Sequence, residues 1–144
     1  MDKHLNSNII IFVAWIIATI SMLGSLFFSE VMAFPPCVLC WYQRICMYPL
    51  VMIFLIGSFQ KAEATLAFSF PLVLMGWIIA IYHNLLHLEI IPEKASPCLE
   101  GVSCSTVYID WLGFITIPLL SFISFTAIGI LLILLKNKLK QEKI

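Results

Sequence analysis

Long apolar segments separated by short polar ones dominate the chain. Four of them are long enough to consider as membrane spans, at about residues 9–28, 40–59, 66–82 and 112–135. A helix rises 1.5 Å per residue, so about 20 apolar residues cross the hydrocarbon core. The second segment reaches that length only if the cysteine-containing stretch forms its outer end, so we expect its helix to begin near Pro36. The pattern predicts an all-α membrane protein with a four-transmembrane-helix bundle.

Composition supports this prediction. Of the 144 residues, 62% are hydrophobic and 11% are charged, and the mean hydropathy is +1.05, whereas a soluble domain is roughly half apolar and a quarter charged. The formal net charge is zero, so no basic surface supports a nucleic-acid partner. Because no repeat, low-complexity tract or hydrophilic linker divides the chain, we expect a single domain over residues 1–144.

Positive charges predict the orientation in the membrane. One side would receive both termini and the 60–65 connection, with Lys3, Lys61, Lys136, Lys138, Lys140 and Lys143. The other side would receive only Arg44 and Lys94. Lysine and arginine are enriched in cytoplasmic segments. We therefore expect both termini in the cytoplasm and the loops at 29–44 and 83–111 outside.

The first apolar segment also resembles a secretory signal. Lys3 precedes it, and Val31-Met32-Ala33 imitates a cleavage site. The uncharged run from Ile9 to Phe28 nevertheless exceeds the roughly 7 to 15 apolar residues of a signal peptide. We therefore expect this segment to remain as the first span.

Four of the five cysteines form two close pairs, Cys37 with Cys40 and Cys98 with Cys104. Both pairs fall on the side predicted to be external, where disulfides persist. A Cys-x-x-Cys pair at a helix start favours a thiolate, because unsatisfied backbone N–H groups and the helix dipole lower the thiol pKa. Cys46 lies half a turn around the helix from Cys37, so we expect it to pack as a buried free thiol.

Arg44 shares a predicted helix face with Cys37 and Cys40, within an arc of about 60°. An arginine at a helix centre in the membrane costs roughly 2.5 to 3.5 kcal/mol, and less toward the interface. Arg44 can be an interfacial snorkelling residue. Alternatively, it can stabilise a thiolate and hydrogen-bond a carbonyl oxygen that gains negative charge on reduction. Its position beside Cys40 favours the second interpretation, electron transfer between thiols and a lipid-soluble acceptor.

The predicted external loop also contains possible zinc ligands. His83 and His87 are four residues apart and could act with Cys98 and Cys104. The histidines fall where the third span is expected to leave the membrane, and polar interfacial roles are more common there, so we expect no metal site. The stretch from Leu85 to Ile91 is apolar enough to lie on the bilayer surface.

Two motifs resemble the DsbB/BdbC family of membrane thiol-quinone oxidoreductases: "CVLCWYQR" at residues 37–44 and "DWLGFITIP" at residues 110–118. The resemblance covers residues 37–118 and the four-span layout. It implies a location in the bacterial cell membrane and a quinone, menaquinone or ubiquinone, as electron acceptor. It also implies a secreted or membrane-anchored thioredoxin-fold disulfide donor as the partner that is reoxidised.

The resemblance further implies a role for each cysteine of the two pairs. Cys37 and Cys40 would exchange electrons with quinone, with Cys40 next to the quinone and Arg44 holding its carbonyl. Cys98 would form the mixed disulfide with the donor protein, and Cys104 would pass electrons on to Cys37. Only five residues separate Cys98 from Cys104, as in the BdbC-like branch, and this short loop leaves the order of the interdisulfide step open.

His83 is a candidate for a second quinone contact, although its offset from Pro92 leaves His87 as an alternative. Two other classes of protein share part of the pattern. A tetraspan structural protein could use the disulfides as staples, but stapling does not require Arg44. A vitamin K epoxide reductase-like enzyme has the two cysteine pairs in the opposite order along the chain.

Overall fold

The computed structural model describes residues 2–92, 98, 103–104 and 116–142. These residues form four α-helices and no strand: α1 (Asp2–Leu26), α2 (Val38–Gly57), α3 (Ala62–His87) and α4 (Ile117–Glu142). A π-helical turn, η1 (Phe27–Val31), continues α1. All four helices are long and apolar enough to cross a membrane, which confirms the predicted all-α, four-helix membrane architecture.

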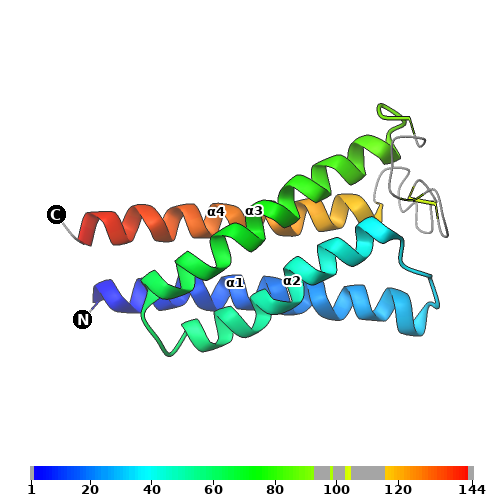
Figure 1. Ribbon diagram of the computed structural model, residues 1–144. Helices are drawn as coiled ribbons and strands as arrows, with labels where there is room; N and C mark the ends of the chain where they lie inside the picture. The colour runs from blue at the N-terminus through cyan, green and yellow to red at the C-terminus, as the bar shows by residue number, and fades with distance from the viewer. Residues whose placement is uncertain (1, 93–97, 99–102, 105–115, 143–144) are drawn as a thin grey trace.

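The four helices are arranged as a ring. Both α1 and α3 pack against α2 and α4, whereas α1 and α3 contact each other only slightly. Both termini and the connection between α2 and α3 lie at one end of the bundle (Figure 1). The start of α2 and the end of α3 lie at the other end, which we call the cysteine end. Which of the two ends faces the outside of the cell stays a prediction.

Small residues allow the helices to approach closely, as is common between membrane helices. Ala14 and Ala18 of α1 are fully buried. Gly76 of α3 lies so close to Phe125 of α4 that an added Cβ atom would overlap the ring. Nearby, the indole N–H of Trp77 donates a 3.0 Å hydrogen bond to the hydroxyl of Thr126. These contacts hold α3 against α4 and therefore set the position of the two helices that lead to the cysteine end.

The start of α2 differs from the prediction. The helix begins at Val38 rather than near Pro36, because Cys37 is extended and its sulfur accepts a hydrogen bond from the backbone N–H of Cys40. Cys37 is therefore the N-cap, a position where a side chain satisfies an unpaired backbone N–H. Residues 38–44 belong to α2 and residues 29–31 to η1, so the loop predicted at 29–44 was too long.

The end of α3 also differs. The helix continues through His87, so residues 83–87 are helical and do not belong to the loop predicted at 83–111. For the same reason Leu85 to His87 do not form a surface segment. The predicted start of the last span at residue 112 lies outside the described residues. Helices α1, α3 and α4 also extend beyond the apolar spans at the end that carries the termini.

Candidate redox site

A cavity of about 420 Å³ lies at the cysteine end, between all four helices. Its wall includes five of the six predicted site residues, namely Cys37, Cys40, Arg44, His83 and Cys104. The sixth, Cys98, is not on the wall but is bonded to Cys104. Most of the remaining wall is apolar and comes from α1, η1, α2 and α4, with Ile20, Phe28, Met47, Ile117 and Phe125 among its members.

Cys37 and Cys40 are thiols whose sulfur atoms lie 2.6 Å apart. The hydrogen bond with the Cys40 sulfur, and then burial, raise the pKa of the Cys37 thiol above its ordinary value. Backbone N–H groups at the helix start act in the opposite direction and lower the pKa of this thiol. Cys40 is the residue of the pair that lies nearer Arg44 along the helix.

The second pair, Cys98 and Cys104, forms a disulfide with the two Cα atoms 5.8 Å apart. Both cysteines are buried, and they pack with Cys37 and with Leu39 and Leu86 in a small apolar cluster. The fold thus brings the second pair against the first, although about 60 residues separate them in the sequence. Cys46 is buried elsewhere as a free thiol in the main core, as expected.

His83 lies between the two pairs and is 1% exposed. Its Nε2 is 3.3 Å from the carbonyl oxygen of Cys104 and 3.8 Å from the Cys37 sulfur. A ring nitrogen and the sulfurs of Cys37 and Cys104 all lie within 4.8 Å of one another. Among the described residues, these three atoms have metal-ligand spacing, whereas the set considered from the sequence also included His87 and Cys98. They could hold a soft cation such as zinc only with the Cys104 disulfide open, because the ligand is a free thiolate.

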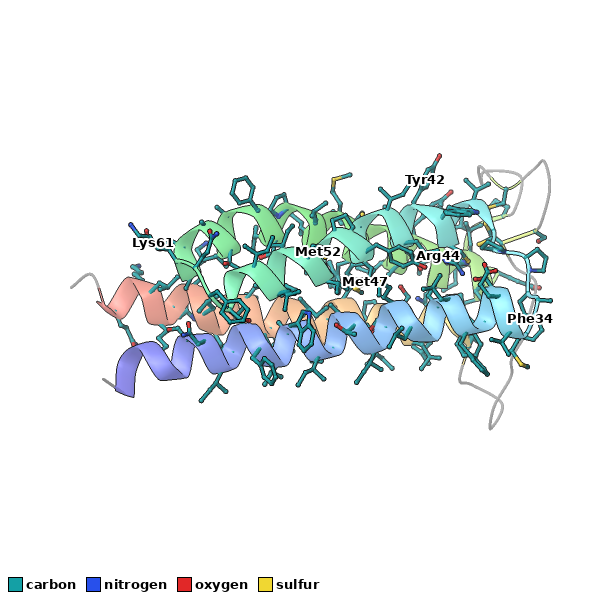
Figure 2. All side chains as sticks on the ribbon, turned by 90° about the horizontal axis from the view of Figure 1, so that it is seen from below. Phe34, Tyr42, Arg44, Met47, Met52 and Lys61 are labelled. Carbon is teal, nitrogen blue, oxygen red and sulfur yellow. A yellow bond between two sulfur atoms is a disulfide. The ribbon has the colours of Figure 1, made fainter. Side chains whose placement is uncertain are left out.

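Arg44 is half-buried and connects two helices. Its Nη2 donates a 2.9 Å hydrogen bond to the backbone carbonyl of Ser25 in α1. The guanidinium also lies 5.4 Å from the centre of the Trp41 ring, within range of a cation–π interaction. Arg44 and Phe34 lie toward the same end of the bundle, far from Lys61 (Figure 2). The cation is therefore held over the cavity by contacts with both α1 and α2.

Sequence reasoning did not identify Gln43 and Tyr48 of this site, and it named His87 only as a possible zinc ligand or as an alternative to His83. The side-chain nitrogen of Gln43 lies 3.3 Å from His83 Nδ1. The hydroxyl of Tyr48 and the Nδ1 atom of His87, both from wall residues, have no hydrogen-bond partner in the described part of the chain. Buried polar atoms are rarely unpaired, so these two are available to a polar ligand that enters the cavity. Tyr48 follows Arg44 by one helical turn, and this spacing could have identified Tyr48 as a site residue from the sequence.

Comparisons with known proteins agree with this chemistry. The family model described as "Disulfide bond formation protein DsbB" matches residues 7–135. The chain is 45% identical to disulfide bond formation protein C of Bacillus subtilis (strain 168) over 133 residues, which cover 92% of this chain and 96% of that protein.

Two proteins of Bacillus anthracis are similar as well. Probable disulfide formation protein C 2 is 46% identical over 132 residues, or 91% of each chain. Probable disulfide formation protein C 1 is 40% identical over 139 residues, or 96% of this chain and 100% of that protein. No solved structure matches the chain. The chain therefore belongs to the DsbB family, as a multi-pass membrane protein with an oxidoreductase role in disulfide bond formation.

Proposed function

We propose that this protein is a thiol-quinone oxidoreductase, built as one domain, that reoxidises an extracytoplasmic thioredoxin-fold disulfide donor and passes the electrons to a membrane quinone. One observation carries the proposal. A single cavity is lined by members of both cysteine pairs and by the only arginine of the chain. The charge distribution of the termini and loops supports placing the cysteine end on the outer side of the bacterial cell membrane.

The first half of the reaction oxidises the donor. A donor thiolate attacks the Cys98 sulfur, so a mixed disulfide forms, the Cys98–Cys104 bond breaks and Cys104 leaves as a thiolate. Cys104 then attacks Cys37 of an oxidised Cys37–Cys40 pair, and Cys40 leaves as a thiolate. Thiolate attack on a disulfide is the general route for such exchanges. The proximity of the Cys37 and Cys104 sulfurs supports this order of steps.

The remaining exchanges restore the second pair. The other donor thiol attacks its own mixed disulfide, releases Cys98 as a thiolate and leaves the donor oxidised. Cys98 then attacks Cys104, which reforms the Cys98–Cys104 disulfide and releases Cys37. The net result is one donor disulfide gained and one Cys37–Cys40 disulfide reduced to two thiols.

A bound quinone would supply an acceptor for two electrons and two protons, which reoxidises Cys37 and Cys40. The residues around the cavity suit such a ligand. The volume of about 420 Å³ lies within the range of roughly 300 to 1,000 Å³ typical of ligand pockets. Arg44 can donate to a carbonyl oxygen, and Tyr48 and His87 offer polar atoms that have no partner among the described residues. The cation of Arg44 would also stabilise the Cys40 thiolate.

The test is a redox titration of the purified, fully reduced membrane protein with menaquinone and ubiquinone analogues in the absence of oxygen. We expect one quinone to be reduced for each Cys37–Cys40 disulfide formed, and no such reduction in a Cys40→Ser variant. Quinone reduction that proceeds equally in Cys40→Ser, or no reduction of either quinone by the unmodified protein, would contradict the proposal.

A further inference from the structure

We propose that His83 aligns Cys104 with Cys37 for the exchange between the two cysteine pairs, and that Gln43 holds the His83 ring in the orientation this requires. The inference rests on the proposed function and assigns His83 to the sulfur exchange rather than to the quinone. It concerns the step in which the Cys104–Cys37 bond forms, the Cys37–Cys40 bond breaks and the electron pair leaves on Cys40.

The contacts of His83 come from two separate parts of the chain, the start of α2 and the segment that contains Cys104. Gln43 of α2 contacts Nδ1 at 3.3 Å. On the other side of the ring, Nε2 faces the carbonyl oxygen of Cys104 at 3.3 Å and the sulfur of Cys37 at 3.8 Å. The ring thus joins the attacking residue, Cys104, to the residue that is attacked, Cys37.

The partners determine where the proton of the imidazole lies. A carbonyl oxygen only accepts hydrogen bonds, so Nε2 must carry the proton that it shares with Cys104. Nδ1 of the neutral ring is then an acceptor, which matches a donating Gln43 amide N–H. A flipped Gln43 amide would require protons on both ring nitrogens, and a charged ring is costly at this burial. Gln43 therefore selects the neutral tautomer with Nε2–H directed at Cys104 and Cys37.

Burial makes this arrangement specific. His83 is 1% exposed, Gln43 7%, Cys37 5% and Cys104 3%. With so little access to water, the carbonyl of Cys104 and the ring have few alternative partners, and an unpaired buried group would be destabilising. The hydrogen bond therefore keeps Cys104 at the α2 N-terminus. The same N–H faces the Cys37 sulfur, where it can stabilise the negative charge that is shared among the sulfurs during attack.

The test measures how readily the sulfurs of Cys37 and Cys104 form a disulfide with each other. A protein carrying Cys40→Ser, Cys46→Ser and Cys98→Ser retains only Cys37 and Cys104. Equilibration of the purified protein with reduced and oxidised glutathione then gives the effective concentration of one thiol for the other. We expect a Cys37–Cys104 disulfide to form readily, and His83→Leu to lower this effective concentration about fivefold to tenfold, as for the loss of one hydrogen bond.

Matched variants separate alignment from simple packing. His83→Gln retains an N–H at a similar reach and should recover part of the lost effective concentration, whereas His83→Leu retains only apolar volume. Gln43→Leu should also lower the effective concentration, because the His83 ring loses the contact that fixes its tautomer. Ile78→Leu, at an exposed position of α3, should leave the effective concentration unchanged. Helix content and thermal unfolding of each variant show whether the fold is retained.

Equal effective concentrations in His83→Leu, His83→Gln and the parent protein would overturn the inference. So would a failure of Cys37 and Cys104 to form a disulfide in a folded parent protein. The measurement uses neither quinone nor donor, so the loss caused by His83→Leu can be found even in a protein that reduces no quinone. In that case the alignment role stands and the proposed function fails. In steady-state turnover, the inference predicts that His83→Leu lowers kcat by slowing the exchange between the two cysteine pairs.

Discussion

The Arg44 guanidinium donates a 2.9 Å hydrogen bond to the backbone carbonyl oxygen of Ser25. This bond joins α2 to α1 at the cavity and leaves the other N–H groups of the guanidinium for further partners. Arg44 is therefore held in place by the protein before a ligand enters. This relationship gives the arginine a structural role as well as the proposed role toward quinone, and the two roles predict different measurements.

Replacing Arg44 by Ala should raise the KM for quinone about tenfold or more, because a hydrogen bond from a charged donor contributes roughly 1.5 to 3 kcal/mol. One turnover of reduced donor by the pre-oxidised protein should proceed at nearly the normal rate, since that half-reaction does not use the cation. Arg44→Lys should restore the function only partly, because lysine lacks the planar fork. Stopped-flow and steady-state measurements check both halves. Unchanged quinone kinetics would show that Arg44 is only an interfacial anchor.

Replacing any one of Cys37, Cys40, Cys98 or Cys104 by Ser should stop reoxidation of the donor, because each sulfur is one step in the same sequence of exchanges. Cys46→Ser is the matched control and should retain nearly full turnover, since this thiol packs in the main core. The measurement is donor oxidation coupled to quinone reduction. Full activity in Cys98→Ser would contradict the order of exchanges proposed above.

Tyr48→Phe should have opposite effects on stability and on ligand binding. Without ligand, removal of a buried hydroxyl that has no partner in the part of the chain that the structure describes should raise the free energy of unfolding by about 1 kcal/mol. If quinone oxygen accepts from this hydroxyl, the KM for quinone should rise by about fivefold. Tyr42→Phe is the control, because Tyr42 is exposed on the same helix. A variant with raised stability and normal quinone kinetics would exclude Tyr48 from the quinone site.

Labelling should establish the sidedness of the cysteine end. After reduction, a membrane-impermeant thiol reagent should reach Cys98 and Cys104 from outside intact cells, while Cys46 stays shielded within the bundle. Because Cys98 and Cys104 are buried in the oxidised state, the comparison requires the reduced protein. Labelling of both cysteines only after the cells are opened would show that the charge-based orientation is wrong.

The close approach of α3 and α4 can be tested with two glycines. Gly76→Ala should lower the free energy of unfolding by about 1 to 3 kcal/mol, because the new methyl group would overlap the Phe125 ring and force a shift in a packed interior. Gly129→Ala of α4 should be nearly neutral, since its nearest neighbour would be Val73 at an ordinary contact distance of 3.8 Å. Unfolding of the detergent-solubilised protein measures both. Equal stabilities would show that the interface tolerates the added methyl.

The helix boundaries show where local reasoning was sufficient and where it was not. The four spans were predicted because a bilayer requires long apolar helices with internally paired backbones. The start of α2 was misplaced because it depends on the Cys37 side chain, which accepts from the Cys40 N–H and caps the helix. The end of α3 was misplaced because His83 is polar in sequence yet fully enclosed by contacts from other elements.

The sequence by itself determined the architecture and the residues that share one face at the start of α2, because hydrophobic length and helical periodicity are local properties. It therefore placed Cys37, Cys40 and Arg44 on one surface of a membrane helix. Only the tertiary structure decided that Gln43, forty residues away, contacts His83, and that His83 faces both Cys37 and Cys104. Those contacts depend on how α2 and α3 pack and on where Cys104 lies after α3. The spacing of residues within one helix does not determine the distance between two helices.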